Sequence, residues 1–115
     1  MSKDIQFTIV GFIVGIDTEQ NTLSIRPSNT IMEDNEKYAI GLIKSPKKAV
    51  LVKFKNIKQD KKSFINFKFK KNTQNLQHLC LALQQRGKVQ LIVKSSQGQP
   101  FDEEECYITN IQWKD

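Results

Sequence analysis

Residues 44–71 are the part of this chain that most restricts how it can fold and what it can contact. The stretch holds eleven lysines and one acidic residue, Asp60, which gives it a net charge of +10. Because the whole chain carries +6, the remaining residues together carry −4. Positive charge this concentrated favours an anionic partner, and nucleic acid is the first candidate.

Apolar and polar side chains alternate in two segments of this stretch, as expected for strands. The segments are residues 49–57 and 63–70, and the polar segment 58–62 between them predicts a β-hairpin. One face of the hairpin would hold six apolar residues: Val50, Val52, Phe54, Ile65, Phe67 and Phe69. The other face would hold four lysines and three apolar residues: Lys53, Lys55, Lys68, Lys70, Leu51, Ile57 and Phe64.

Two interpretations of the lysine face remain open. Lysines that face one another across strands repel, and bound phosphates would remove that repulsion. Phe64 lies on the same predicted face, where an aromatic ring could stack on a base. The alternative is that the lysines cover a solvated face and keep a sheet edge from aggregating. A slip of one residue in either strand would exchange the faces and turn the phenylalanines outward.

The composition is that of one globular domain, residues 1–115, with 38 % hydrophobic and 26 % charged residues. Only Arg26 and Arg86 are arginines, and lysine contacts phosphates without reading bases. Cys80, Cys106 and His78 have no metal-site spacing, so we expect buried free thiols and no metal or cofactor. The apolar segment 5–16 lacks the flanks of a signal peptide and is too short to span a bilayer, so we expect a cytoplasmic protein with no membrane partner.

The rest of the chain predicts further strands. Residues 5–16 form a long strand, buried on both faces, that curls and serves two halves of a barrel, with a bulge or bend at its glycines. A strand in an ordinary sandwich is the alternative. Residues 22–26 are a strand with Leu23 and Ile25 inward. Residues 28–37 are expected to be a loop. The later segments expected to be strands are 38–43, 88–94 and 106–113.

One helix is predicted at about residues 73–86. Thr73 is its N-cap, and Gly87 follows its end, where a left-handed residue is wanted. Its apolar stripe consists of Leu76, Leu79, Cys80 and Leu83, which Leu81 and Ala82 widen. Residues 95–105 are expected to be a loop whose carboxylates, 102–105, are solvated.

The predicted order of elements is mainly β, with one helix before the last two strands. It resembles the OB-fold, a five- to six-stranded Greek-key barrel that binds oligonucleotides. The sequence LQHLCLALQQRGKVQLIV, residues 76–93, is similar to the helix–glycine–strand passage of bacterial single-stranded-DNA-binding proteins. GFIVGIDTEQNTLSI, residues 11–25, is similar to the opening hairpin of many OB-folds. The chain departs from that family in its acidic loop, residues 102–105, and in having no glutamine- and glycine-rich tail with an acidic tip.

Charge and resemblance together lead to the hypothesis of a non-enzymatic protein that binds single-stranded nucleic acid, DNA before RNA, with low sequence specificity. The residues expected to contact it are Lys53, Lys55, Lys68 and Lys70, with Lys44, Lys47, Lys48, Lys71 and Arg26 around them, and Phe64 and Tyr38 as stacking residues. A homo-oligomer, or a replication or recombination protein, is the other expected partner. The competing hypothesis is an adaptor that docks an acidic protein or a second subunit on an apolar patch of Leu51, Ile57 and Phe64.

Overall fold

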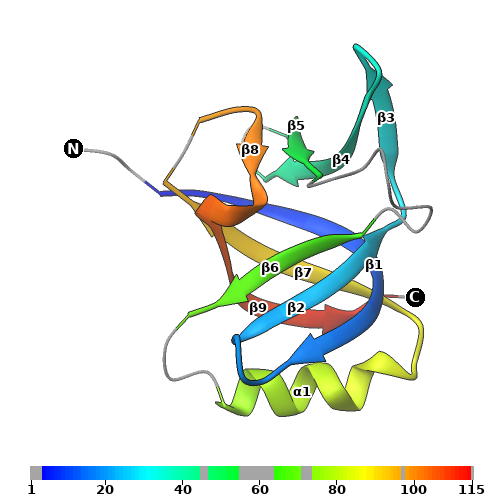
Figure 1. Cartoon of the computed structure of the whole chain (residues 1–115), viewed down its shortest axis with the longest axis vertical. Helices are drawn as coiled ribbons and strands as arrows, with labels where there is room; N and C mark the ends of the chain where they lie inside the picture. Colours follow the sequence, from blue (N-terminus) through cyan, green and yellow to red (C-terminus); the bar gives the residue numbers. More distant parts are fainter. Residues whose placement is uncertain (1–3, 45–46, 55–63, 71–73, 97, 115) are drawn as a thin grey trace.

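The computed structural model describes residues 4–44, 47–54, 64–70, 74–96 and 98–114. These residues form a mainly β structure with one α-helix, as the sequence predicts (Figure 1). The elements are β1 (Ile5–Asp17), β2 (Thr22–Pro27), β3 (Thr30–Glu33), β4 (Glu36–Ile43), β5 (Lys48–Lys53), β6 (Ile65–Phe69), α1 (Gln74–Gln84), β7 (Lys88–Ser95), β8 (Phe101–Asp102), the short 3₁₀ helix η2 (Glu103–Glu105) and β9 (Cys106–Trp113).

The long strand β1 has different partners along its length. Its N-terminal half pairs antiparallel with β7, and its C-terminal half pairs antiparallel with β2. The register with β2 shifts between Ile13 and Gly15, as in a β-bulge. The predicted irregularity in this strand is therefore confirmed beside Gly15, and its service to two halves of a barrel stays a prediction. Burial on both faces is wrong at Val14, which is 47 % exposed because it is the extra residue at this irregularity.

Gly11 is where β1 and β2 approach most tightly. A Cβ atom at this position would lie 2.3 Å from the carbonyl oxygen of Arg26, so no side chain fits there. Because Gly11 has no side chain, β1 can pair with both β7 and β2 at this position. The next residue, Phe12, lies directly opposite Arg26.

The strand pairings form a ring around the main core. From β1 they run through β2, β6, β9 and β7 and return to β1. The β6–β9 pair is parallel and the other four pairs are antiparallel. The helix α1 packs against β1 and β9, and it lies across the lower end of these strands in Figure 1. The largest fully buried side chains contributed by the ring strands are Phe7, Phe67, Ile9, Leu23, Ile25, Ile65, Leu91, Ile108 and Val89.

The strands β3, β4, β5 and β8 extend the sheet beyond β1. β4 meets β1 at the Thr8–Leu42 pair and runs antiparallel to β3 and β5, while β5 runs parallel to β8. The expectation of a loop at residues 28–37 is wrong, because this segment forms β3 and the start of β4. Asp34 and Asn35 make the turn between them with φ angles of 52° and 63°. Aspartate and asparagine tolerate this left-handed backbone, so the polar composition encodes a tight hairpin turn.

The predicted basic hairpin is wrong in its pairing but right in its faces. β5 pairs with β4 and β8, whereas β6 pairs with β2 and β9. Val50, Val52, Ile65, Phe67 and Phe69 are nevertheless buried as predicted, and the slipped register that would turn the phenylalanines outward does not occur. Alternation determines which side chains point inward, but it carries no information about which strands pair with each other.

The helix is close to its prediction but buries a narrower stripe. Cys80 is fully buried, and Leu76 and Leu83 pack against the core. Leu79 and Leu81 are 41 % and 48 % exposed, so their assignment to the buried stripe is wrong, because α1 rests on the ring along a single edge. Gly87 has a φ of 110°, which confirms the left-handed residue after the helix. The predicted N-cap, Thr73, lies outside the described residues.

Both cysteines are buried free thiols, as predicted. Burial raises the pKa of the Cys80 thiol to about 12 and that of the Cys106 thiol to about 11. Cys106 Sγ also donates to the carbonyl oxygen of Asp102 at 3.3 Å. In the described ranges, no helix is both long and apolar enough to cross a membrane.

Candidate functional site

The outward side chains of β1, β2, β6 and β9 share one surface, which we call the cationic face. Strand register aligns them in rows, with Phe12 opposite Arg26, Ser24 opposite Asn66, and Lys68 beside Tyr107. The residues that define the face are Phe12, Ser24, Arg26, Phe64, Asn66, Lys68, Lys70 and Tyr107. Their neighbours along the chain, among the residues that the structure describes, are buried, so alternation sends these side chains outward.

A hollow of about 420 Å³ lies on this face where β1 bulges. It is lined by Val14, Gly15, Ser24, Arg26 and Phe64. Because Gly15 has no side chain, space remains between the exposed Val14 and Phe64, which directly precedes β6. Two residues predicted from sequence to contact nucleic acid, Arg26 and Phe64, therefore border the same hollow although they are 38 positions apart in the sequence.

Cations lie close to aromatic rings at two points of the face. The guanidinium carbon of Arg26 is 5.4 Å from the ring centroid of Phe12, and Nζ of Lys70 is 6.0 Å from that of Tyr107. Both distances are within the range of cation–π attraction. Tyr107 Oη donates to Oδ2 of Asp4 at 2.9 Å, and this bond raises the pKa of Tyr107. The ring of Tyr107 is thus anchored by a hydrogen bond and lies beside a positive charge.

A buried carboxylate supports β6, which carries Asn66 and Lys68 and is flanked by Phe64 and Lys70. Glu103 is only 3 % exposed, and its Oε2 accepts a hydrogen bond from the backbone N–H of Asn66 at 3.0 Å. The expectation that residues 102–105 form a solvated loop is therefore wrong for Glu103. The loop folds back as β8 and η2, and the side chain of Asp102 caps η2 by accepting from Glu104 N at 3.2 Å.

A second link fixes the far end of β6. Asn21 Nδ2 donates to the carbonyl oxygen of Phe69 at 3.1 Å, and Asn21 Oδ1 accepts from Nε2 of Gln77 on α1. Ser24 Oγ also donates to Oδ1 of Asn66 across the β2–β6 pair. These bonds hold β2, β6 and α1 together behind the cationic face.

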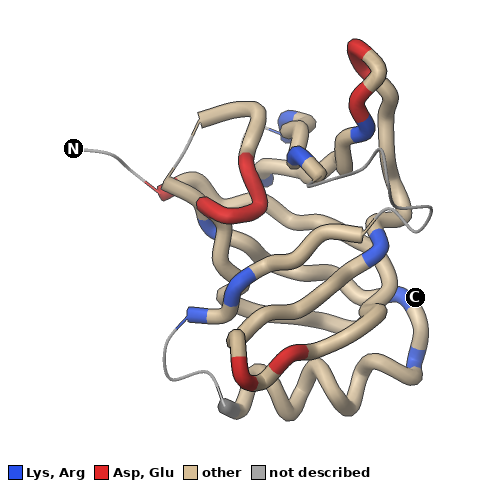
Figure 2. The backbone as a smooth tube through the Cα atoms, in the orientation of Figure 1, with Lys and Arg blue, Asp and Glu red and all other residues tan. Residues whose placement is uncertain are grey.

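The structure divides the predicted contact residues between two regions. Arg26, Phe64, Lys68 and Lys70 belong to the cationic face. Five others lie on or beside β4 and β5: Tyr38, Lys44, Lys47, Lys48 and Lys53. Lys55 and Lys71 lie outside the described residues. The idea of one shared lysine surface is therefore wrong, as Figure 2 shows by the separation of the basic positions, because β5 and β6 are not neighbours.

Tyr38, expected to stack on a base, has a different environment. Its hydroxyl donates to Oε2 of Glu36 at 2.7 Å, and that bond raises the pKa of Tyr38. The nearby carboxylates of Glu33 and Asp34 raise it further. The carboxylates of Glu33, Asp34 and Glu36 thus outnumber the two lysines near Tyr38, Lys37 and Lys53.

The adaptor patch of Leu51, Ile57 and Phe64 is not assembled by the described residues. Leu51 lies on β5 opposite Ile40, whereas Phe64 borders the hollow beside β6. Ile57 is outside the described ranges.

Sequence reasoning missed four contributors to the cationic face: Phe12, Ser24, Asn66 and Tyr107. Each had a usable signal, because each alternates with core residues in its strand. What the sequence lacks is the fact that β1, β2, β6 and β9 lie side by side, which depends on pairing between distant segments.

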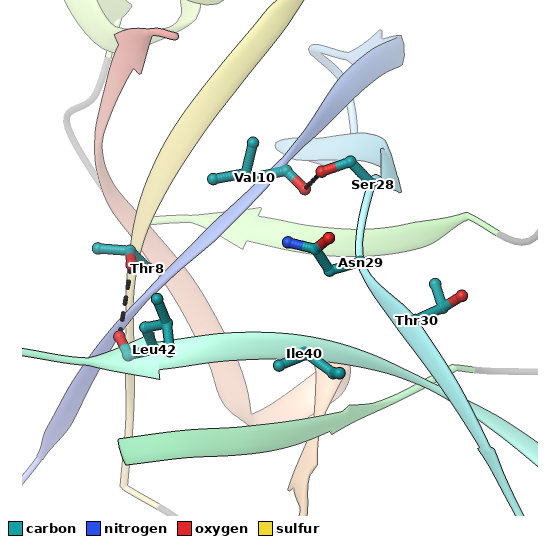
Figure 3. Close-up of a pocket in the computed structure, with 7 residues that line it drawn as sticks. All are labelled: Thr8, Val10, Ser28, Asn29, Thr30, Ile40 and Leu42. Atoms are coloured by element: carbon teal, nitrogen blue, oxygen red, sulfur yellow. Dashed lines mark hydrogen bonds between the residues drawn. The ribbon is translucent and has the colours of Figure 1, made fainter. Parts of the chain in front are cut away.

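A second hollow, of about 390 Å³, lies between β1 and β4 (Figure 3). Its lining consists of Thr8, Val10, Ser28, Asn29, Thr30, Ile40 and Leu42. Two lining hydroxyls donate hydrogen bonds to backbone carbonyls: Ser28 Oγ donates to Val10 O at 3.1 Å, and Thr8 Oγ1 donates to Leu42 O at 3.4 Å. This lining holds no ionisable group, so it offers no acid or base for chemistry.

Comparison with protein-family models, with curated proteins and with solved structures finds no match for this chain.

Proposed function

We propose that the protein is a non-enzymatic binder of single-stranded nucleic acid, DNA in the first place, and that its ring of strands is an OB-fold barrel. The fold proposal is supported by the ring of pairings β1–β2–β6–β9–β7, by the parallel β6–β9 pair, and by the position of α1 between β6 and β7. OB-folds bind oligonucleotides on the face of their second and third strands. The corresponding strands here are β2 and β6.

The observation that carries the functional proposal is that Arg26 and Phe64 border one hollow on that face. Unstacked bases bind by stacking on aromatic rings or guanidinium planes, and each stacked base contributes about 1–3 kcal/mol. Lysines at the rim attract phosphates without reading sequence. A hollow with one aromatic wall and one cationic wall suits a single base of any kind.

The proposed path of the strand follows β2 and β6. A base enters the hollow between Phe64 and Arg26, while the exposed ammonium groups of Lys68 and Lys70 contact the next phosphates. Tyr107 offers a second ring at the other end of the face, beside Lys70. This path needs no contribution from β5, and it replaces the shared lysine surface expected from sequence.

The test is the binding of fluorescent oligonucleotides, followed by anisotropy at several salt concentrations. Phe64→Ala should weaken binding by about 5- to 150-fold, the equivalent of one lost stack. Trp113→Ala is the control for the loss of an aromatic ring, because Trp113 is 50 % exposed and has Arg86 5.6 Å from its ring, but it lies at the end of β9 opposite to Tyr107. Equal losses in the two variants, or no binding at low salt, would contradict the proposal.

The adaptor hypothesis remains the second candidate function, on a different surface. The exposed apolar side chains Ile31 and Leu42 lie on β3 and β4, outside the cationic face. A protein that binds through both regions would combine the two functions. The two buried free thiols suit the reducing conditions of the cytoplasm, where we propose that the protein acts.

A further inference from the structure

The outer surface of β3, β4 and β5 is apolar although it faces away from the core. Cross-strand pairs align Ile31 with Tyr38, Ile40 with Leu51, and Leu42 with Ala49. We call the five apolar residues of these pairs, Ile31, Ile40, Leu42, Ala49 and Leu51, the outer apolar face. The alternate residues Ala39, Val50 and Val52 are fully buried, so the strands have already used their other face for the core.

Three residues of the outer apolar face are exposed to solvent. Ile31 is 42 % exposed and Leu42 is 49 % exposed, and Ala49 is also exposed. The hollow of Figure 3 opens beside Ile40 and Leu42 and adds Val10 to the same apolar surface. Contiguous apolar surface with a hollow in it is typical of a site that another protein covers.

Opposite charges lie at the two ends of this face. The hairpin turn at one end holds Glu33, Asp34 and Glu36, which we call the acidic tip; its position is red at the top of Figure 2. The other end holds Lys44, Lys47 and Lys48, which we call the basic end. Lys37 and Lys53 lie near the tip and reduce its net charge from −3 to −1, while the basic end keeps +3.

The distance between the two ends prevents them from neutralising each other within one chain. The strand β4 leads from Glu36 to Lys44, and at about 3.3 Å per residue the ends are about 26 Å apart. This is about three times the screening length at physiological salt. The two ends therefore act as separate charged patches, each of which attracts the opposite charge on a partner.

We propose that the outer apolar face binds a second copy of this chain in a two-fold, antiparallel arrangement. In that arrangement β4 of one copy runs opposite to β4 of the other, so each acidic tip meets the partner's basic end. The apolar residues between the ends pack against each other, and the hollow beside Leu42 receives side chains of the partner. Two-fold interfaces require a self-complementary surface, and this face has that property in both charge and polarity.

The dimer does not depend on the proposed nucleic-acid function. The outer apolar face lies on β3, β4 and β5, whereas the cationic face lies on β1, β2, β6 and β9. The second copy would thus leave Arg26, Phe64 and Lys68 open, and a failure of either proposal would leave the other standing.

The first test measures mass by sedimentation equilibrium on protein freed of nucleic acid by nuclease treatment. The wild-type chain should form a dimer that weakens as salt is raised. Leu42→Asp should raise the dissociation constant at least about tenfold, because it buries a charge in the interface. Leu81→Asp is the matched control, since Leu81 on α1 is 48 % exposed, close to the 49 % of Leu42. A monomer at every concentration, or equal effects of both variants, would overturn the proposal.

The second test reverses charge at one end at a time. The variant Glu33→Lys/Glu36→Lys has two positive ends, and Lys47→Glu/Lys48→Glu has two negative ends. Each should be monomeric alone, and an equal mixture of the two should form a heterodimer. If each variant still self-associates, or if the mixture stays monomeric, the antiparallel arrangement is wrong. Circular dichroism of each variant distinguishes loss of folding from loss of association.

Discussion

The strands β5 and β6 show how similar residue patterns lead to different surroundings. Both place buried apolar residues next to an exposed lysine: Val50 and Val52 are buried beside Lys53 in β5, and Phe67 and Phe69 are buried beside Lys68 in β6. β6 lies between β2 and β9, with Tyr107 next to Lys68. β5 lies between β4 and β8, with Tyr38 next to Lys53.

Because β5 and β6 have different neighbouring strands, different charges surround Lys53 and Lys68. Lys68 shares its surface with Arg26 and Lys70, and the aromatic rings there stand beside cations. Lys53 shares its surface with apolar side chains and stands near the acidic tip. A lysine count therefore says little about binding until the neighbouring strands are known, because potential at a surface is the sum over all nearby charges.

The largest expected effect comes from removing the core side chain beneath each surface. Phe67→Ala should lower the free energy of unfolding by about 3–5 kcal/mol, because a large fully buried ring leaves a cavity. Val52→Ala, in β5, removes less volume and should cost about 2 kcal/mol. Urea denaturation of both variants measures the difference. A larger loss for Val52→Ala would contradict the assignment of the main core to the ring.

Removing the carboxylate that supports β6 should have a smaller effect. Glu103→Ala removes the acceptor of the part-buried hydrogen bond from the Asn66 N–H, at a cost of about 1–3 kcal/mol. The exposed Glu105→Ala is the control and should change stability by less than about 0.5 kcal/mol. Hydrogen exchange would locate the change: amides of β6 should lose protection in Glu103→Ala, and those of β4 should not. Uniform loss across the sheet would argue against a local support role.

Removing one lysine from β6 or from β5 should show, through the salt dependence of nucleic-acid binding, which of the two strands contacts phosphates. If Lys68 contacts a phosphate, Lys68→Ala should reduce the slope of log affinity against log salt by about 0.7, the value for one contact on a single strand. Lys53→Ala should leave the slope unchanged, because β5 lies off the proposed path. Anisotropy titrations over a salt series measure both slopes. Equal reductions would mean that β5 takes part in binding.

The smallest expected effect is the response of stability to high pH. Burial raises the pKa values of Cys80 and Cys106 above that of an unfolded thiol, which is about 9. The neutral thiols therefore stabilise the fold fully below about pH 9, and this stability is lost as the pH rises toward about 11 to 12. Replacing Cys80 by alanine should flatten the decline in the free energy of unfolding between about pH 8.5 and about pH 10.5, measured by denaturation at each pH. An unchanged decline would show that other groups cause it.

Local features of this fold were predictable from sequence. Alternation placed Val50, Val52, Phe67 and Phe69 in the core, and Gly87 marked the end of the helix, because both follow from the geometry of a single element. The β3–β4 hairpin was missed although Asp34 and Asn35 encode its turn. The polar, acidic composition of residues 28–37 predicts a loop, whereas only the two turn residues need to be polar.

The candidate site was less predictable. Arg26 and Phe64 were identified from their chemistry, but Phe12 and Tyr107 join them only through pairings with distant parts of the chain. The burial of Glu103 likewise depends on its bond to Asn66 in β6, 37 positions away. Contacts of this kind are set by packing of the whole sheet, which alternation within one strand does not encode.

Ultraviolet cross-linking of the wild-type protein to a thymidine oligonucleotide, followed by mass spectrometry of the adducts, tests the central claim most directly. The cationic face predicts adducts on Phe64, Phe12 and Tyr107 that disappear when excess single-stranded competitor is added. Adducts confined to Tyr38 or Trp113, or none at low salt, would contradict it.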